Sequence, residues 1–190
     1  MILRRTSFIT ALLFASVALN TNASTSVDPE LRASLKKAIA ETAKFKDRWE
    51  AEVWFTDMNQ RLKKRIKDHS ERLELLQLIH YEARRANLQP ELVMAIIEIE
   101  SSFDRWAISR VGAQGLMQVM PFWLKEIGKP GDNLFDVQTN LRMGCTILRH
   151  YLDKENGNLI RALGRYNGSL GSFRYPSKVM TAMQTKWYRP

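Results

Sequence analysis

The sequence predicts a mostly α-helical domain, and three observations carry this expectation. Apolar residues recur at three- and four-residue spacing along most of the chain. Proline and small polar residues stand where helices would begin, and alternating strand patterns are scarce. The chain has 190 residues, of which 45% are hydrophobic and 26% charged, so it can build one domain with a sizeable core and is not a disordered chain.

Residues 1–23 are predicted to be a cleavable signal peptide. Arg4 and Arg5 form a basic n-region, residues 7–19 contain no charge, and residues 21–23 offer a cleavage site. The apolar run is shorter than the roughly 20 residues that a membrane span needs. An uncleaved anchor is the alternative. The prediction implies export to the periplasm.

Three helical patterns follow in residues 24–87. Asp28 and Pro29 are a good N-cap and first helical residue, and Asp68 with Glu71 resembles a capping box. Asn87 is the expected stop of the third helix. The three apolar stripes consist of Leu31, Leu35, Ala38 and Ile39, then Trp54, Met58, Leu62 and Ile66, then Leu75, Leu76, Ile79, Ala83 and Ala86. Residues 24–70, the most charged part of the remaining chain, are expected to form an N-terminal helical extension.

A fourth helix begins at Pro90 and is apolar on nearly all sides through Ile99, which predicts that it is buried. Residues 101–121 then lose the helical pattern and are punctuated by glycines and a proline. Helical patterns resume from Phe122 and over residues 137–156, 159–165 and 179–187.

The chain is strongly basic, with 29 Lys and Arg against 20 Asp and Glu and a formal charge of +9. Without residues 1–23 two arginines are lost and the charge becomes +7. A basic surface attracts polyanions, so nucleic acid, the anionic bacterial envelope and simple solvation all stay open on charge alone. The dense basic run at residues 61–65 lies in a helical pattern and is interpreted as a solvated helix face.

Cysteine and histidine usage gives no sign of a disulfide or a metal. Cys145 is the only cysteine, and with Leu141, Leu148 and Leu152 it follows helical spacing, so it is interpreted as a core residue and not as a nucleophile. The three histidines are far apart and form no metal-binding motif. We therefore expect no cofactor.

One acidic residue stands out at the end of the fourth helix. Glu98 and Glu100 point roughly 200° apart, because successive residues turn by about 100°. One turn before Glu100 are Ile96 and Ile97, so its carboxyl group should emerge beside apolar groups. Such surroundings raise the pKa of a carboxyl group, as a general acid near neutral pH requires. The alternative is an ordinary solvated glutamate at a helix end.

Several segments around and after Glu100 resemble the glutamate-serine, GLMQ and tyrosine-asparagine motifs of the soluble lytic transglycosylases. They are, in order, Glu100-Ser101-Ser102-Phe103, Gly112-Ala113-Gln114-Gly115-Leu116-Met117-Gln118-Val119-Met120-Pro121, the trio Asn140, Arg142 and Gly144, and Arg165-Tyr166-Asn167-Gly168. Order and spacing both agree over residues 71–175. The resemblance implies a goose-lysozyme-like catalytic domain, expected over residues 71–190.

The resemblance also implies roles for individual residues. Glu100 matches the catalytic acid and base, and Tyr166 matches the tyrosine that orients it. The other matched positions are Ser109 near the glutamate, Gln118 at the sugar, Met117 and Met120 at the cleft, and Asn167 beside the tyrosine. Each has a structural alternative: Ser109 as a turn residue, the methionines as core, and Tyr166 as a packed ring with its hydroxyl at the surface. Arg165 departs from the alanine usual in the family and puts fine substrate preference in doubt.

The implied reaction is cleavage of the β-1,4 bond between N-acetylmuramic acid and N-acetylglucosamine in peptidoglycan, with 1,6-anhydro ends formed by a single glutamate. Two other functions stay open: a lysozyme-type hydrolase and a catalytically idle peptidoglycan-binding module. A nucleic-acid-binding protein is disfavoured by the signal segment and the lack of a recognisable motif. The expected partner is the glycan strand, bound by a monomer whose basic surface offers a contact with the envelope.

Overall fold

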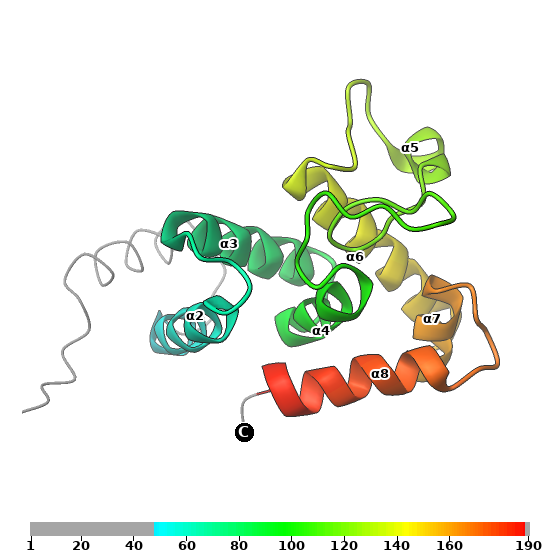
Figure 1. Ribbon diagram of the computed structural model, residues 1–190. Helices are drawn as coiled ribbons and strands as arrows, with labels where there is room; N and C mark the ends of the chain where they lie inside the picture. The colour runs from blue at the N-terminus through cyan, green and yellow to red at the C-terminus, as the bar shows by residue number, and fades with distance from the viewer. Residues whose placement is uncertain (1–47, 189–190) are drawn as a thin grey trace, which may run out of the picture.

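The computed structural model describes residues 48–188 and their side chains from Glu52 onward (Figure 1). The described elements are α2 (Arg48–Leu62), α3 (His69–Arg85), α4 (Pro90–Glu100), α5 (Phe122–Ile127), α6 (Val137–Lys154), α7 (Leu159–Tyr166), α8 (Arg174–Ala182) and the π-helix η1 (Met183–Trp187). Between residues 48 and 188 there is no strand, only two isolated bridges in the loop at 108–119. The predicted mostly α class is therefore confirmed. The signal segment and the helix predicted from Pro29 lie outside the described residues.

The stripes predicted for α2 and α3 are buried, and Asp68 caps α3 by accepting a hydrogen bond from the Glu71 backbone N–H at 2.8 Å. The interpretation of residues 61–65 as one helix face is wrong, because α2 ends at Leu62 and the last three basic residues lie beyond it. Lys63 and Lys64 are exposed in the turn. Sequence periodicity did not detect this helix end because no glycine or proline marks it.

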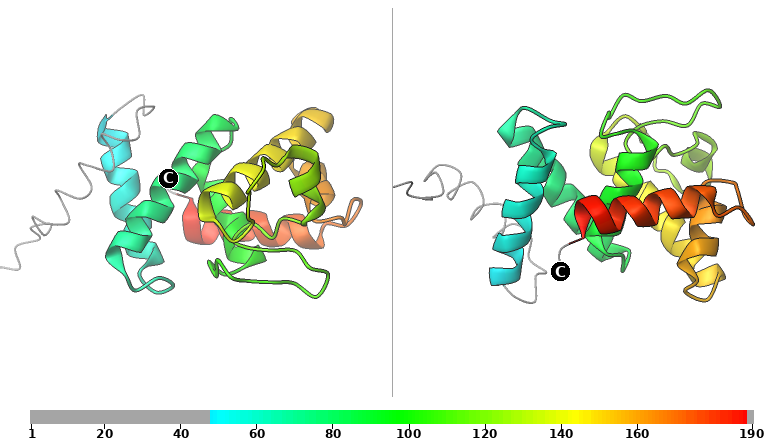
Figure 2. Two further views of the ribbon diagram at one scale, coloured as in Figure 1. Left: turned by 90° about the horizontal axis from the view of Figure 1, so that it is seen from above. Right: turned by 60° about the horizontal axis from the view of Figure 1, so that its bottom comes forward.

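Helix α4 occupies the centre of the fold, between α3 on one side and α8 with η1 on the other (Figures 1 and 2). Pro90 opens the helix, and every residue from Leu92 to Glu98 is buried. The buried side chains of α2, α3, α4, α6, α7 and α8 belong to one hydrophobic cluster. The predicted boundary between an extension and a catalytic domain near residue 70 stays a prediction.

The last helix begins earlier than the sequence pattern predicts. We expected a helix from Val179, whereas α8 starts at Arg174 and continues into η1. Tyr175, Val179 and Ala182 share the buried face at the helical spacing of four and three residues. The helical pattern was recognised only from Val179, so Tyr175 was not recognised as a helical residue.

None of the helices within residues 48–188 has the length and apolar character required to cross a bilayer. Cys145 is fully buried in α6, as predicted, and burial raises the pKa of its thiol well above the ordinary value. No group of three or more metal-binding side chains occurs in this described part of the chain.

Candidate active site

The loop between α4 and α5 is held against α6 by one buried amide. The Asn140 side chain donates to the backbone oxygens of Gln114 and Leu134 at 2.9 and 2.8 Å, and accepts from the Met117 N–H at 2.8 Å. The chain passes so close to it that a Cβ atom at Gly115 would lie 2.3 Å from the Asn140 amide nitrogen. Gly115 also has a φ of 74°, which favours glycine. The loop therefore has a fixed position relative to the end of α4.

Glu100 is the last residue of α4 and is partly buried. The Tyr175 hydroxyl, from the first turn of α8, donates a hydrogen bond to Glu100 Oε1 at 2.6 Å. Burial raises the pKa of Glu100 to about 7, although the hydrogen bond from Tyr175 acts in the opposite direction. A carboxyl group with this pKa holds a proton on roughly half of the molecules at neutral pH, so it can act as a general acid.

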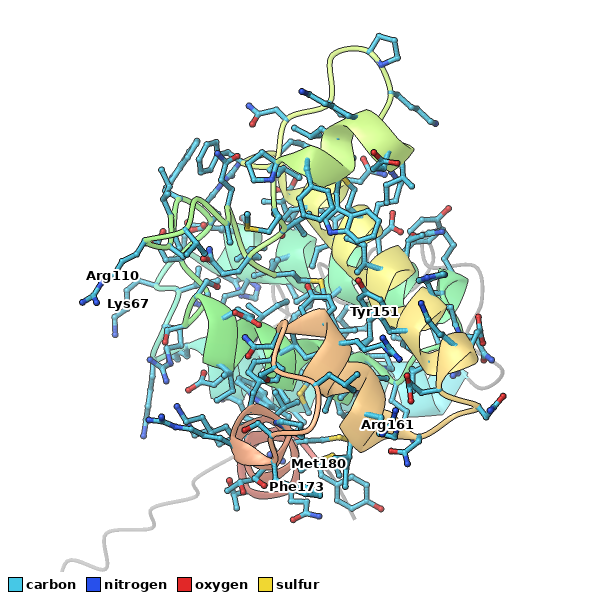
Figure 3. The ribbon with its side chains drawn as sticks, turned by 90° about the vertical axis from the view of Figure 1, so that its right-hand side faces the viewer. Lys67, Arg110, Tyr151, Arg161, Phe173 and Met180 are labelled. Carbon is cyan, nitrogen blue, oxygen red and sulfur yellow. The ribbon has the colours of Figure 1, made fainter. Side chains whose placement is uncertain are left out.

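The pocket beside Glu100 has a volume of about 330 Å³. It lies between the end of α4, the turn after α7 and the start of α8, the helix that Phe173 and Met180 mark in Figure 3. Its lining consists of Ile99, Glu100, Asn167, Ser169, Ser172, Arg174, Tyr175 and Lys178. Within the described residues this lining contains a single carboxyl group and no histidine or cysteine.

Two predicted site residues, Glu100 and Asn167, come together in this pocket. Asn167 is exposed, and its Oδ1 accepts a hydrogen bond from the Ser169 hydroxyl at 3.1 Å. Tyr166 reaches the loop instead, because its hydroxyl donates to the Met117 backbone oxygen at 2.7 Å. The hydrogen bond on Glu100 is made by Tyr175, and the role that the resemblance implies for Tyr166, to orient the glutamate, stays a prediction.

The remaining predicted residues lie in the loop and do not line the Glu100 pocket. Ser109 is partly buried and pairs with Ala113 through both its backbone N–H and its hydroxyl oxygen. The Gln118 amide nitrogen donates to the backbone oxygens of Ala107 and Gly115. Both side chains thus shape the loop. Met120 is partly buried at the end of the loop.

Met117 is fully buried in the structure, in contrast to the cleft position that the resemblance implies. Its side chain packs on α6 where Gly144 leaves room, since a Cβ atom there would lie 2.5 Å from the Met117 sulfur. The buried position matches the structural alternative given for this methionine. Its backbone oxygen, which accepts from Tyr166, ties the loop to α7.

Arg165, which departs from the family pattern, has a partner in the structure. Its guanidinium and that of Arg161 both bind the carboxylate of Glu155, and these two arginines hold the pKa of Glu155 below its ordinary value. Arg165 therefore shares the Glu155 carboxylate with Arg161 and does not line the Glu100 pocket.

The sequence analysis did not identify two residues that are important to this site. Asn140 was noted only as part of a motif, and Tyr175 was not singled out at all. A signal for Tyr175 exists in the sequence, since it lies four residues before Val179 and seven before Ala182 on one helical face. Its contact with Glu100 spans 75 residues, and no local pattern reports such a distance.

A helical domain with one high-pKa carboxyl group in an open pocket has the features of an enzyme that works by acid and base catalysis. The family model of the transglycosylase SLT domain matches residues 77–186, more than half of the chain. The chain therefore belongs to the SLT family, which confirms the resemblance inferred from the motifs.

Two curated relatives are similar over the same region. The transglycosylase of Enterobacteria phage PRD1 is 38% identical over 101 residues, which are 50% of this chain and 37% of that protein. The membrane-bound lytic murein transglycosylase C of Yersinia pestis is 34% identical over 113 residues, which are 51% of this chain and 32% of that protein. The chain thus spans about a third of the length of these relatives.

Among solved structures, the 70 kDa soluble lytic transglycosylase of Escherichia coli is similar at 20% identity with a TM-score of 0.46. The similarity covers 79% of this chain and 29% of that one.

Proposed function

We propose that this protein is a peptidoglycan lytic transglycosylase in which Glu100 serves first as the acid and then as the base. The observation that carries the proposal is the raised pKa of Glu100, about 7, in a pocket where it is the one carboxyl group among the described lining residues. Family membership and the named activities of the two relatives support the same reaction class.

In the first step, protonated Glu100 donates its proton to the oxygen that links N-acetylmuramic acid to N-acetylglucosamine. The bond between this oxygen and C1 of the muramic acid breaks, and N-acetylglucosamine leaves with the proton as a hydroxyl group. Burial favours the protonated form before the reaction, and the Tyr175 hydroxyl stabilises the carboxylate that remains after it. The acetamido group of the substrate stabilises the positive charge that develops at C1, as in substrate-assisted glycosidases.

In the second step, the Glu100 carboxylate accepts the proton of the muramoyl C6 hydroxyl. The C6 oxygen then attacks C1 of the same sugar and closes the 1,6-anhydro ring, so the carboxyl group regains its proton. Because the attack is intramolecular, correct positioning replaces an external nucleophile. A pocket with one carboxyl group suits this route better than a route that needs two.

Neither of the nearest acidic residues is suited to act as a second catalytic group. The Asp104 carboxylate accepts the Trp106 backbone N–H at 2.9 Å and stabilises a turn. Glu98 binds Arg65 and Lys186 and does not line the Glu100 pocket.

The roles of the other predicted residues belong to the same proposal. Asn167 would contact the sugar directly, because it is exposed and lines the Glu100 pocket. Ser109, Gln118 and Met120 would contact a longer glycan that passes over the loop, and Met117 and Tyr166 hold that loop through the Met117 backbone oxygen. Residues 1–23 would direct the protein to the periplasm, where peptidoglycan lies.

Digestion of purified sacculi followed by mass spectrometry tests the proposed function. We expect muropeptides with 1,6-anhydro ends, which are lighter by one water than the hydrated products of a lysozyme-type hydrolase. Hydrated ends alone would replace the proposal with the hydrolase. Sedimentation with sacculi without release of any product would indicate an idle binding module.

A further inference from the structure

Two cations beside Glu100 differ from the other cations in the same part of the chain. Residues 159–188 contain five Lys and Arg residues. Three of them have carboxylate partners, because Arg161 and Arg165 bind Glu155 and Lys186 binds Glu98. The other two, Arg174 and Lys178, are exposed and have no carboxylate partner within residues 48–188.

Both unpaired cations line the Glu100 pocket. They lie four residues apart on α8, so their side chains project from the same face of the helix. They share the pocket with Glu100 and yet form no ion pair with it, and burial keeps the pKa of Glu100 high. Their charges are therefore available to a ligand that occupies the pocket.

The pocket continues along α8 into a second hollow of about 350 Å³. Ile99 and Lys178 line both hollows, and Ser177, Thr181 and Thr185 line the second one. A ligand group that leaves the Glu100 pocket at Lys178 thus meets a shallow groove with hydroxyl groups along its wall. The two cations thus lie where the groove begins and attract an anionic ligand group.

We propose that Arg174, Lys178 and the groove along α8 bind the free carboxylates of the stem peptide that peptidoglycan carries on its muramic acid. This inference rests on the proposed function, which places muramic acid next to Glu100. The stem peptide is attached to the lactyl group of that sugar, so it leaves the reacting unit close to the glutamate. The cation pair thereby makes the enzyme prefer glycan strands whose peptides carry free carboxylates.

The chemistry of the two cations suits carboxylates of this kind. A guanidinium group can hold a carboxylate through two parallel hydrogen bonds, while an ammonium group acts as a point charge that tolerates several positions. Because both side chains are exposed, water and salt screen each contact, and the preference should be modest, about tenfold for the pair.

The experiment compares two substrates that differ only in peptide charge. One is peptide-bearing glycan strands, and the other is the same strands after their free carboxylates have been converted to methylamides. The variant Arg174→Gln/Lys178→Gln removes the pair, and Lys63→Gln/Lys64→Gln removes the same charge from the exposed turn after α2. For each protein, kcat/KM is measured on both substrates as release of anhydro products.

We expect kcat/KM of the unaltered protein to fall about tenfold when the carboxylates are amidated. The Arg174→Gln/Lys178→Gln variant should cleave both substrates at the lower value, and the Lys63→Gln/Lys64→Gln control should keep the preference. The proposal is overturned if the first variant keeps the preference, if the control loses it equally, or if the unaltered protein has none.

A binding measurement separates this inference from the proposed function. Each pair of substitutions is placed in a Glu100→Gln background, and sedimentation with the two kinds of strand is compared. An unaltered protein that binds both strands and releases no anhydro product contradicts the proposed function. The carboxylate subsite is then rejected if Arg174→Gln/Lys178→Gln does not weaken sedimentation with the charged strands.

Discussion

Two glutamates near the end of α4, two residues apart, have opposite electrostatic surroundings. Glu98 is only 6% exposed, and its carboxylate binds Arg65 from the turn after α2 and Lys186 from η1. Glu100, two residues later, has no cationic partner within residues 48–188 and accepts one hydrogen bond, from the neutral Tyr175 hydroxyl. One carboxyl group joins three segments of the fold, and the other retains a proton near neutral pH.

The difference shows that neighbours, and not residue type or burial alone, decide what a buried carboxyl group does. Two cations compensate for the loss of hydration around Glu98 and make it a structural link. No cation forms an ion pair with Glu100 within residues 48–188, so burial raises its pKa to about 7. The turn of the helix separates the two functions, because side chains two positions apart face different neighbours.

The largest expected effect is on activity, when Glu100 or Glu98 is replaced by glutamine. Glu100→Gln keeps the shape of the side chain and removes the exchangeable proton, so release of products from sacculi should fall by about 10²–10⁴-fold. Glu98→Gln should retain activity within a few-fold, because its side chain does not line the pocket. Equal losses in both variants, measured by product release under the same conditions, would show that the assigned roles are wrong.

Much of this arrangement could be predicted from the sequence where the information is local. The apolar stretch after Pro90 indicated a buried helix, and the isoleucines before Glu100 indicated an apolar setting for its carboxyl group. Helix geometry alone predicts that Glu98 and Glu100 face different neighbours, and their different partners agree with this.

The partners themselves could not be predicted, since they come from distant segments. Tyr175 lies 75 residues after Glu100, and Lys186 lies 88 residues after Glu98. Tyr166, which was expected to orient Glu100, donates its hydrogen bond to the Met117 backbone oxygen. The packing of α7 and α8 against α4 decides whether Tyr166 or Tyr175 donates to the Glu100 carboxyl group. The periodicity of the sequence does not indicate this packing.

The second expected effect is on the pH dependence of stability. The pKa of Glu100 is about 7 in the folded protein and near 4.5 when unfolded, so the folded state binds the proton more tightly. This contribution is complete below pH 4.5 and is lost as the pH rises through 7, at a cost of up to about 3 kcal/mol. Glu100→Gln lacks the titrating group and should therefore be more stable than the unaltered protein at pH 8.

Urea unfolding of both proteins between pH 4 and pH 8 measures this effect. His80, whose pKa burial lowers to about 4, makes both proteins less stable as the pH falls below 6.5, and this contribution cancels in the difference. A stability difference that stays constant across the whole range would show that Glu100 ionises normally in the folded protein.

The third effect concerns the structural carboxylate. Glu98→Gln should lower the free energy of unfolding by about 1–2 kcal/mol, because hydrogen bonds between charged groups are replaced by weaker ones. The loss stays moderate since the side chains of Arg65 and Lys186 are 40% and 51% exposed and can be hydrated without it. Urea unfolding at pH 7 measures the change, and an unchanged midpoint would indicate that the two ion pairs contribute nothing.

The smallest expected effect comes from Tyr175. It distinguishes a role of this residue in the structure from a role in setting the pKa of Glu100. Tyr175→Phe removes the hydrogen bond that stabilises the Glu100 carboxylate, so the pKa of Glu100 should rise further. A hydrogen bond to a charged group contributes about 1.5 kcal/mol or more, which corresponds to about one pKa unit. The pH at which kcat/KM declines on the alkaline side should therefore move upward by about one unit, while the rate itself falls. A purely structural role for Tyr175 would lower the rate and leave the position of that decline unchanged, whereas Tyr166→Phe, which removes a hydrogen bond to the backbone, should not shift the decline.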